Sequence, residues 1–241
     1  MMKANTRGWP IAVLLALLSA GCATQPEAPD FQALVASPDR SDAARAIDAR
    51  RKPVQLLAFY GVRPGMQVLD ISAGGGHNTE LLARAVGASG RVYAQIPAAG
   101  RLDARMQKPV MKNVVPVTRG FDDPVPPEAR NLDLVTFNFN YHDLVYMGID
   151  RAKTNRAVFD ALKPGGSYIV ADHSGRPGTG ATETKTLHRI DEAFVRREIE
   201  AAGFRFVAEG GFLRNPQDPR DASVFKPKQP NDEFVLKFVK P

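Results

Sequence analysis

Apolar and polar positions follow two periodicities along the chain, which predict short strands that alternate with helices. Apolar runs of strand length cover residues 66–71, 90–95, 114–117, 132–139 and 167–171, and two more at 204–209 and 233–239 close the chain. Helical spacing covers residues 78–86, 151–162 and 191–202. Short apolar strands that alternate with helices are typical of a mainly parallel sheet covered on both faces. We therefore expect an α/β fold whose ligands bind beyond the carboxyl ends of the strands.

Proline, glycine and capping residues refine these boundaries. Residues 41–59 have helical spacing, but Pro53 interrupts it, so we expect two short helices or a kink. Asp191 suits the N-cap of the helix over 191–202, and Gly203 suits the position past its end. The proline-rich stretch 212–232 is either a lid or a long connection between the last two strands.

The first 22 residues have the layout of an export signal. Lys3 and Arg7 give a positive start, and an apolar run over 11–18 is shorter than the ~18 residues that a membrane-spanning helix needs. The small residues before Cys22 resemble a bacterial lipobox, although Ser19 stands where an aliphatic residue is usual. The alternative is a plain secretory signal with an incidental cysteine. We expect a lipoprotein signal.

The chain then divides into three parts. Residues 1–21 are the expected signal peptide, 22–40 the lipidated Cys22 with a Pro-rich tether, and 41–241 the folded domain. We expect a periplasm-facing lipoprotein of the cell envelope, anchored in a membrane through lipid on Cys22.

Composition excludes several classes of protein. The 241 residues include one cysteine, which excludes an intramolecular disulfide and a CxxC pair. The net charge of +6 falls to +4 without residues 1–21, since these hold two basic residues and no acidic one. The remaining basic residues are scattered, so we expect no nucleic-acid partner.

The strongest local signal is a glycine-rich turn between a strand and a helix. Residues 68–80 read VLDISAGGGHNTE. Glycines let a ligand approach the main chain, and the free N–H groups at a helix start favour an anionic group. Neither the dinucleotide pattern nor a P-loop is present. The alternative to a ligand site is a glycine-rich turn that serves only the tight packing of the strand against the helix.

This turn resembles the first motif of class I S-adenosylmethionine-dependent methyltransferases, acid-x-G-x-G-x-G. Asp70, Gly74 and Gly76 match, and Ser72 stands in place of the first glycine. A closer resemblance, over residues 41–241, is to a group of uncharacterised bacterial envelope proteins described as predicted methyltransferases. It rests on segments 51–53, 59–65, 74–76, 140–143, 172–174, 187–191 and 238–241. The resemblance implies a Rossmann-like class I methyltransferase fold, with a mostly parallel seven-stranded sheet, helices on both faces and an antiparallel last strand.

The resemblance also implies S-adenosylmethionine as the cofactor. Asp70 would hold its ammonium end, directly or through water, and the glycine backbone would meet the methionine carboxylate and the sugar. Gln95 stands where an acid usually binds the ribose, and Asp122 where an acid often meets the adenine amino group, with Asp123 as an equally placed neighbour. The expected cofactor-binding set is Asp70, Ser72, Gly74, Gly75, Gly76, Gln95, Asp122 and Asn138.

A polar cluster, Asn-Phe-Asn-Tyr-His-Asp, covers residues 138–143 at the end of the fourth expected strand. Methyl transfer to oxygen or nitrogen is an in-line displacement in which the acceptor can need to lose a proton, and histidine suits a general base. We expect His142 as the base, with Tyr141 and Asp143 as orienting or proton-accepting neighbours. The alternative is that the histidine and aspartate satisfy loop backbone groups. The Asn-Pro-Pro-Tyr type signature is absent, which argues against an amine on DNA as substrate.

The four histidines all lie beside motifs, at His77, His142, His173 and His188. Imidazole and carboxylate are normal metal ligands, and acidic residues are close to these histidines in the sequence. No HxxxH or HExxH spacing is present, so we expect a polar substrate pocket and no metal site.

Two functions from different classes fit these features. The first is a methyltransferase that acts on a small molecule or an envelope component, and the second is a non-catalytic ligand-binding lipoprotein on the same fold. Ser72, Gln95 and the export of the chain away from the cytoplasm, where S-adenosylmethionine is made, favour the second. Asp70, the triple glycine and the Tyr-His-Asp cluster favour the first, which we adopt.

Overall fold

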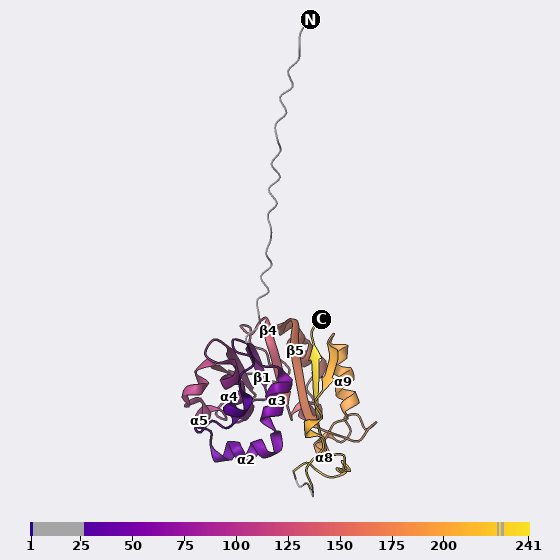
Figure 1. The fold of residues 1–241 in the computed structure, drawn as a ribbon. Coiled ribbons are helices and arrows are strands. Elements are labelled where there is room, and N and C mark those ends of the chain that lie inside the picture. The colour runs from indigo at the N-terminus through magenta and orange to yellow at the C-terminus, as the bar shows by residue number, and fades with distance from the viewer. Residues whose placement is uncertain (2–26, 226, 228) are drawn as a thin grey trace.

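A seven-stranded sheet in the order β3-β2-β1-β4-β5-β7-β6 runs through the computed structural model (Figure 1). The strands are β1 Gln67–Ile71, β2 Arg91–Ile96, β3 Val114–Thr118, β4 Leu132–Asn138, β5 Leu162–His173, β6 Arg205–Glu209 and β7 Glu233–Val239. Strands β1 to β5 pair in parallel, and β7 is antiparallel to both of its neighbours. All seven expected strands are present, although β5 begins at Leu162 rather than at residue 167. The expected α/β class and antiparallel last strand are confirmed.

The structure describes residue 1 and residues 27–225, 227 and 229–241. The expected signal peptide over 1–21 and the expected lipid site at Cys22 therefore lie outside the described residues, except for Met1. In the described part of the chain, no helix has the length and apolar character needed to cross a bilayer.

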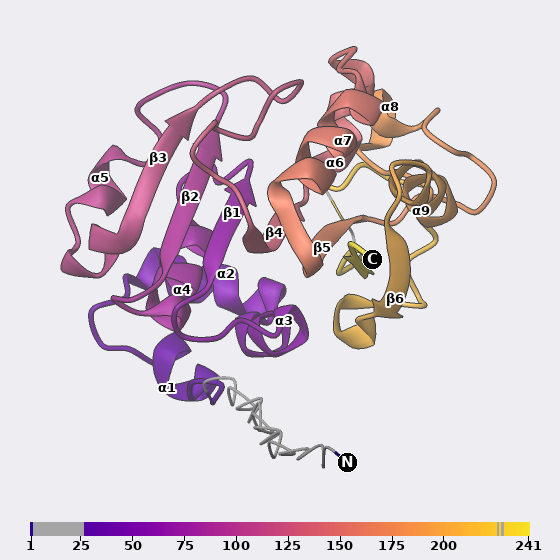
Figure 2. The ribbon, with the colours of Figure 1, turned by 90° about the horizontal axis from the view of Figure 1, so that it is seen from above.

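Helices form one layer on each face of the sheet (Figure 2). α3 (Pro53–Tyr60) and α4 (His77–Val86) cover one face, and α6 (Tyr141–Tyr146), α7 (Arg151–Ala161) and α9 (Glu192–Ala201) cover the other. The remaining short helices are α1 Phe31–Val35, α2 Asp42–Arg51, α5 Asp103–Met106, α8 Thr184–Leu187 and the 3-10 turns Pro109–Asn113 and Gly211–Leu213. Each layer buries its own apolar cluster against the sheet. The polar residues at the strand ends lie outside both clusters.

The expected helix boundaries follow from local backbone chemistry. α2 ends before Lys52, which adopts the left-handed conformation, and Pro53 occupies the first turn of α3. Asp191 caps α9 by accepting a hydrogen bond from the Ala193 backbone, and Gly203 follows with φ of 104°. The sequence therefore predicts both the break near residue 52 and the two ends of α9.

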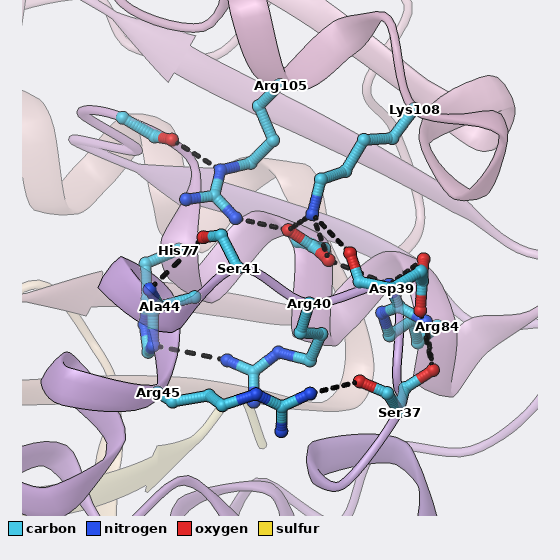
Figure 3. Close-up of polar contacts among 12 residues, drawn as sticks. Ser37, Asp39, Arg40, Ser41, Ala44, Arg45, His77, Arg84, Arg105 and Lys108 are labelled. Atoms are coloured by element: carbon cyan, nitrogen blue, oxygen red, sulfur yellow. Dashed lines mark hydrogen bonds and ion pairs between the residues drawn. The ribbon is translucent and has the colours of Figure 1, made fainter.

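The folded part of the chain begins before residue 41. α1 (Phe31–Val35) packs against α3 and α4. Arg84 of α4 donates hydrogen bonds to the side chains of Ser37 and Asp39, as the labelled side chains in Figure 3 show. These contacts hold residues 31–40 on the domain, so the tether expected over 22–40 ends near residue 30.

A buried carboxylate links this segment to the rest of the α4 layer. Glu80 is fully buried and accepts hydrogen bonds from Arg84, Arg105 and Lys108. Burial alone would raise the pKa of Glu80, but the hydrogen bonds from these cations lower it overall. Arg105 and Lys108 reach Glu80 from the segment after β2, so the ionised Glu80 joins that segment to α4, and Arg84 extends the network to Ser37 and Asp39.

Candidate functional site

A cavity of about 330 Å³ lies at the carboxyl ends of β1 and β4, where the strand order reverses. One wall comes from the glycine-rich turn and the end of β4 and is largely polar, with Asp70, Ser72, Gly75, Asn78 and Asn138 beside the apolar Phe139. α2 and α3 contribute the apolar side chains of Ile47, Leu56 and Leu57, and α2 also contributes Arg50 and Arg51. A volume of this order suits a small organic ligand, for which ~300–1,000 Å³ is usual.

The glycine-rich turn presents its backbone to this cavity. Gly76 has φ of 76°, and a Cβ there would lie 2.6 Å from the Leu102 side chain, so only glycine fits. Gly75 lines the cavity and has open space where a Cβ would stand. α4 begins directly afterwards at His77, and the first N–H groups of a helix have no partner within it. The turn can therefore receive an anionic group of a ligand.

Asp70 acts in the site through the side chains that donate hydrogen bonds to it. Its side chain is 2% exposed and accepts hydrogen bonds from Asn78 Nδ2 at 2.8 Å, Thr79 Oγ1 at 2.6 Å and Thr136 Oγ1 at 2.8 Å. Burial raises the pKa of the Asp70 carboxyl. With three donors of this chain on its two oxygens, Asp70 fixes Asn78 and the first turn of α4 at the edge of the cavity.

Asn138 is the expected cofactor residue with an unused polar atom. Its Nδ2 donates to the hydroxyl of Tyr60 at 2.9 Å. Its Oδ1 is buried and has no hydrogen-bond partner among the described residues, and Asn138 lines the cavity. An unpaired buried acceptor costs roughly 1–3 kcal/mol. The site therefore fits a ligand that brings a hydrogen-bond donor to this point.

Gln95 and Asp122 are not in the cavity, which corrects two expectations. Gln95 is fully buried, and its Oε1 accepts from the Ser72 backbone at 2.8 Å while its Nε2 donates to the Arg119 carbonyl at 2.6 Å. An amide can bridge a backbone donor and a backbone acceptor in this way, and it then has no free oxygen for a ribose. The Asp122 side chain is 55% exposed and pairs with Lys153 at 3.6 Å, outside the cavity.

Tyr141 also lies away from the expected site. Its side chain is fully buried on the α7 side of the sheet, where its hydroxyl donates to Glu198 at 3.0 Å and accepts from Asn155 at 2.9 Å. The reason is that α6 begins at Tyr141, so Tyr141 and Leu144 share the face that packs on the core. The expected orienting role of Tyr141 is not supported by its position.

His142 lies between two carboxylates. Its Nδ1 is 2.7 Å from Asp172 Oδ1, and its Nε2 is 3.0 Å from Asp143 Oδ1 and 3.3 Å from His188 Nδ1. Burial alone would lower the pKa of His142, but Asp172 and Asp143 raise it to about 10. Both ring nitrogens of His142 thus face carboxylates, and the raised pKa disfavours the neutral imidazole that the expected general base requires.

A second cavity, of about 470 Å³, adjoins the first. His142, Asp143, His173 and His188 line it, with Val224 and Phe225 from the connection between β6 and β7. Arg50, Arg51, Phe139 and Asn140 line both cavities. The 212–232 stretch thus borders the site, and Arg189 holds it through Asp218 at 2.9 Å.

Sequence reasoning left Arg51, Asp172 and His188 out of the site. Arg51 places its guanidinium 3.1 Å from the centre of the Phe139 ring, between the two cavities. All three residues belong to the segments that carry the family resemblance, which was the available signal. Their spacing along the chain gives no sign that they meet, because the convergence is produced by the order of the strands.

Comparisons with known proteins agree with this fold. No protein-family model matches the chain. It is 28% identical over 172 residues to the ubiquinone/menaquinone biosynthesis C-methyltransferase UbiE of Cronobacter sakazakii, covering 68% of this chain and 66% of that protein. The chain thus spans just under two thirds of the length of the curated relatives it matches.

Solved structures show the same fold. A SAM-dependent methyltransferase from Aquifex aeolicus superposes with a TM-score of 0.60 at 20% identity, covering 84% of this chain and 100% of that one. Geranyl diphosphate C-methyltransferase from Streptomyces coelicolor gives 0.58 at 13% identity, covering 90% and 91%. The sheet and the glycine turn define the class I methyltransferase fold. The chain thus has the fold of class I S-adenosylmethionine-dependent methyltransferases and is similar in sequence to one of them, as the resemblance of its glycine motif predicts.

Proposed function

We propose that this chain binds S-adenosylmethionine in the first cavity and transfers its methyl group to a small-molecule or envelope acceptor in the second. The observation that carries the proposal is the unpaired Oδ1 of Asn138, buried beside the glycine-rich turn in a cavity of suitable size. When bound, S-adenosylmethionine supplies a methyl group on a positively charged sulfur.

The residues around the cavity fit the three polar and apolar parts of that cofactor. Asn138 Oδ1 would accept a hydrogen bond from the ammonium group. The backbone of Gly75 and the first turn of α4 would receive the carboxylate. The apolar side chains of Leu56 and Leu57 would cover the less polar end and exclude water. Asp70 would keep Asn78 and α4 in place.

The second cavity favours an acceptor with an anionic or hydroxyl group. Arg50 and Arg51 bring positive charge to its wall. His142, held between Asp172 and Asp143, also lines this cavity. Asp143, whose pKa falls to about 2 because His142 and Asn140 outweigh its burial, is ionised at neutral pH and can accept one. These groups can orient an acceptor toward the first cavity.

The cell envelope is the proposed location. The layout of residues 1–22, with a positive start, a short apolar run and Cys22 after small residues, supports an exported lipoprotein. The proposed membrane attachment is the lipid on Cys22, and the proposed partner is a small molecule rather than a nucleic acid.

Calorimetric titration of the purified chain with S-adenosylmethionine tests the cofactor part of the proposal. We expect one site per chain, and Asn138→Ala should weaken binding by about 10–100-fold, since a hydrogen bond to a charged group is worth roughly 1.5–3 kcal/mol. Asp122→Ala is the matched control and should bind like the wild type, because Asp122 lies outside the cavity. No heat at millimolar cofactor would overturn the proposal.

Transfer is tested separately by following the release of S-adenosylhomocysteine with envelope extracts as the source of acceptor. Product formation that depends on the extract supports the methyltransferase. Cofactor binding without any product would favour the second candidate, a non-catalytic binding protein, for which the departures at Ser72 and Gln95 from the family motif are the observation in favour.

A further inference from the structure

Three potential metal ligands point toward one another at the inner end of the second cavity. His142 Nε2 lies 3.0 Å from Asp143 Oδ1 and 3.3 Å from His188 Nδ1, and His188 Nδ1 lies 3.6 Å from Asp143 Oδ1. Two of the residues come from the first turn of α6, and His188 directly follows α8. We call these three side chains the His-Asp-His cluster.

The distances between the three ligand atoms match those between ligands of a single metal ion. Ligands at the corners of a tetrahedron, about 2.0–2.1 Å from Zn²⁺, lie roughly 3.3–3.4 Å from one another. The three separations in the cluster lie on both sides of that value. An ion placed between the three atoms would reach normal bond lengths to all of them with only small shifts of the side chains.

Asp172 holds His142 in the tautomer that a metal needs. Its Oδ1 accepts from His142 Nδ1 at 2.7 Å, and its oxygens also accept the backbone N–H groups of His142 and His173 at 2.8 Å. With Nδ1–H donated to Asp172, the Nε2 lone pair of a neutral His142 points into the cluster. A carboxylate behind a histidine is the usual support of a metal-bound imidazole.

Asp143 directs one carboxylate oxygen at the two histidines of the cluster. Its Oδ2 accepts a hydrogen bond from Asn140, but its buried Oδ1 makes no hydrogen bond of normal geometry among the described residues. His188 adopts the left-handed conformation, with φ of 54°, a position that costs about 1–3 kcal/mol and that accumulates at functional sites. The Asp143 oxygen and the His188 ring nitrogen are thus placed where both can contact one cation.

We propose that His142, Asp143 and His188 bind a divalent transition-metal ion such as Zn²⁺. Two imidazoles and one carboxylate are a ligand set that such ions accept, with coordination positions left open. The ion takes the place of the Nε2 proton of His142, which is released on binding. The proposal departs from the sequence-based expectation that no metal site is present.

The open positions of the metal would face the second cavity, where Arg50 and Arg51 line the wall. An anionic oxygen would therefore be attracted to the metal by the ion itself and by the nearby guanidinium groups. This part rests on the proposed function: the metal would bind and orient an oxygen-bearing acceptor, a phenolate, alkoxide or carboxylate, beside the cofactor cavity.

Zinc titration of metal-stripped protein tests the site without any turnover. The chain carries Cys22→Ser throughout, so that the thiol does not compete for metal. We expect one Zn²⁺ per chain, and Co²⁺ in its place should give the intense visible absorption of a four- or five-coordinate site. His188→Ala and Asp143→Ala should each weaken binding by more than about 10–100-fold, the loss that disturbing even a supporting residue causes.

His77→Ala is the matched control, because His77 is also half-buried beside a carboxylate but belongs to the other cavity. It should bind zinc as tightly as the parent. Absence of stoichiometric zinc binding, or equal affinity in the parent and His188→Ala, would overturn the proposal. An equal loss in His77→Ala and His188→Ala would also overturn it, since it would show binding outside the cluster.

S-adenosylmethionine titration of the same samples separates this proposal from the proposed function. Zinc binding without cofactor binding would leave the metal site intact and remove the methyltransferase. Cofactor binding without zinc binding would remove the metal site and leave the proposed methyltransferase intact.

Discussion

The hydroxyl of Ser72 donates a hydrogen bond to the side-chain oxygen of Asn140 across 3.0 Å. This bond joins the glycine-rich turn after β1 to the segment after β4, and Asn140 in turn donates to Asp143 in the second cavity. Ser72 has φ of 58°, a conformation that glycine adopts more readily. The serine at the first glycine position of the family motif is therefore part of the link between the two cavities.

Two substitutions at Ser72 separate its hydrogen bond from its backbone conformation. Ser72→Ala loses the bond and keeps the unfavourable φ, so we expect the free energy of unfolding to fall by about 1–2 kcal/mol. Ser72→Gly loses the same bond but removes a cost of about 1–2 kcal/mol, so it should be the more stable variant. Urea denaturation measures both. An alanine variant as stable as the wild type would contradict the importance of the bond.

Gln95→Glu tests whether Gln95 is a structural residue. The substitution removes the donor to the Arg119 carbonyl and places a carboxylate against that oxygen in a buried position. We expect a loss of about 2–4 kcal/mol in the free energy of unfolding. The exposed Gln107→Glu serves as the control and should change little. Tighter S-adenosylmethionine binding with unchanged stability would instead place Gln95 at the ribose.

Tyr141→Phe separates the interior role of Tyr141 from the expected role in the site. The substitution leaves Glu198 and Asn155 without the hydroxyl, so thermal or urea unfolding should show a loss of about 1–2 kcal/mol. Cofactor affinity should remain that of the wild type, because Tyr141 lies in the α7 layer and not in either cavity. A Tyr141→Phe variant that keeps its stability but loses cofactor binding would instead place Tyr141 in the site.

The sequence predicts the strands well because their apolar runs are bounded by strong signals. Gly87 and Gly90 separate α4 from β2, and Lys52 with Pro53 separates α2 from α3. The glycine-rich turn is also predicted, because only glycine fits at Gly76. These features depend on the local backbone, and single residues report them directly.

The predicted site residues are less accurate because each depends on where a side chain points. Tyr141 and His142 are neighbours, but the helix that begins at Tyr141 turns them by about 100° from each other, one to the core and one to the cavity. Gln95 stands at the expected strand end but uses both ends of its amide on the backbone. The sequence does not indicate that α6 begins at residue 141, so residues 138–143 are interpreted from sequence as a loop at the end of a strand.

Glu80→Gln tests the ionised network beneath the first cavity. The variant loses the charge that Arg84, Arg105 and Lys108 share, and we expect a loss of about 2–3 kcal/mol at pH 7, because these cations are partly exposed and a fully buried pair would lose more. Since the pKa of Glu80 is lowered in the folded protein, its contribution is complete above its ordinary range near 4.5 and is lost as the pH falls through the folded value.

Urea denaturation at several pH values between 7 and 3 measures this difference. The gap between the wild type and Glu80→Gln should narrow as the pH falls below about 4.5. Exposed Glu128→Gln is the control and should show almost no gap at any of these values. A gap that is independent of pH would show that the amide costs stability through packing rather than through charge.

The most direct test of the account is a crystal structure of the chain grown with S-adenosylhomocysteine, the product that remains after transfer. The account predicts the ligand between α2, α3 and the glycine-rich turn, with its amino group on Asn138 Oδ1 and its carboxylate at Gly75 and the start of α4. A ligand bound against Gln95 and Asp122 instead, or a cavity that excludes it at saturating concentration, would contradict the account.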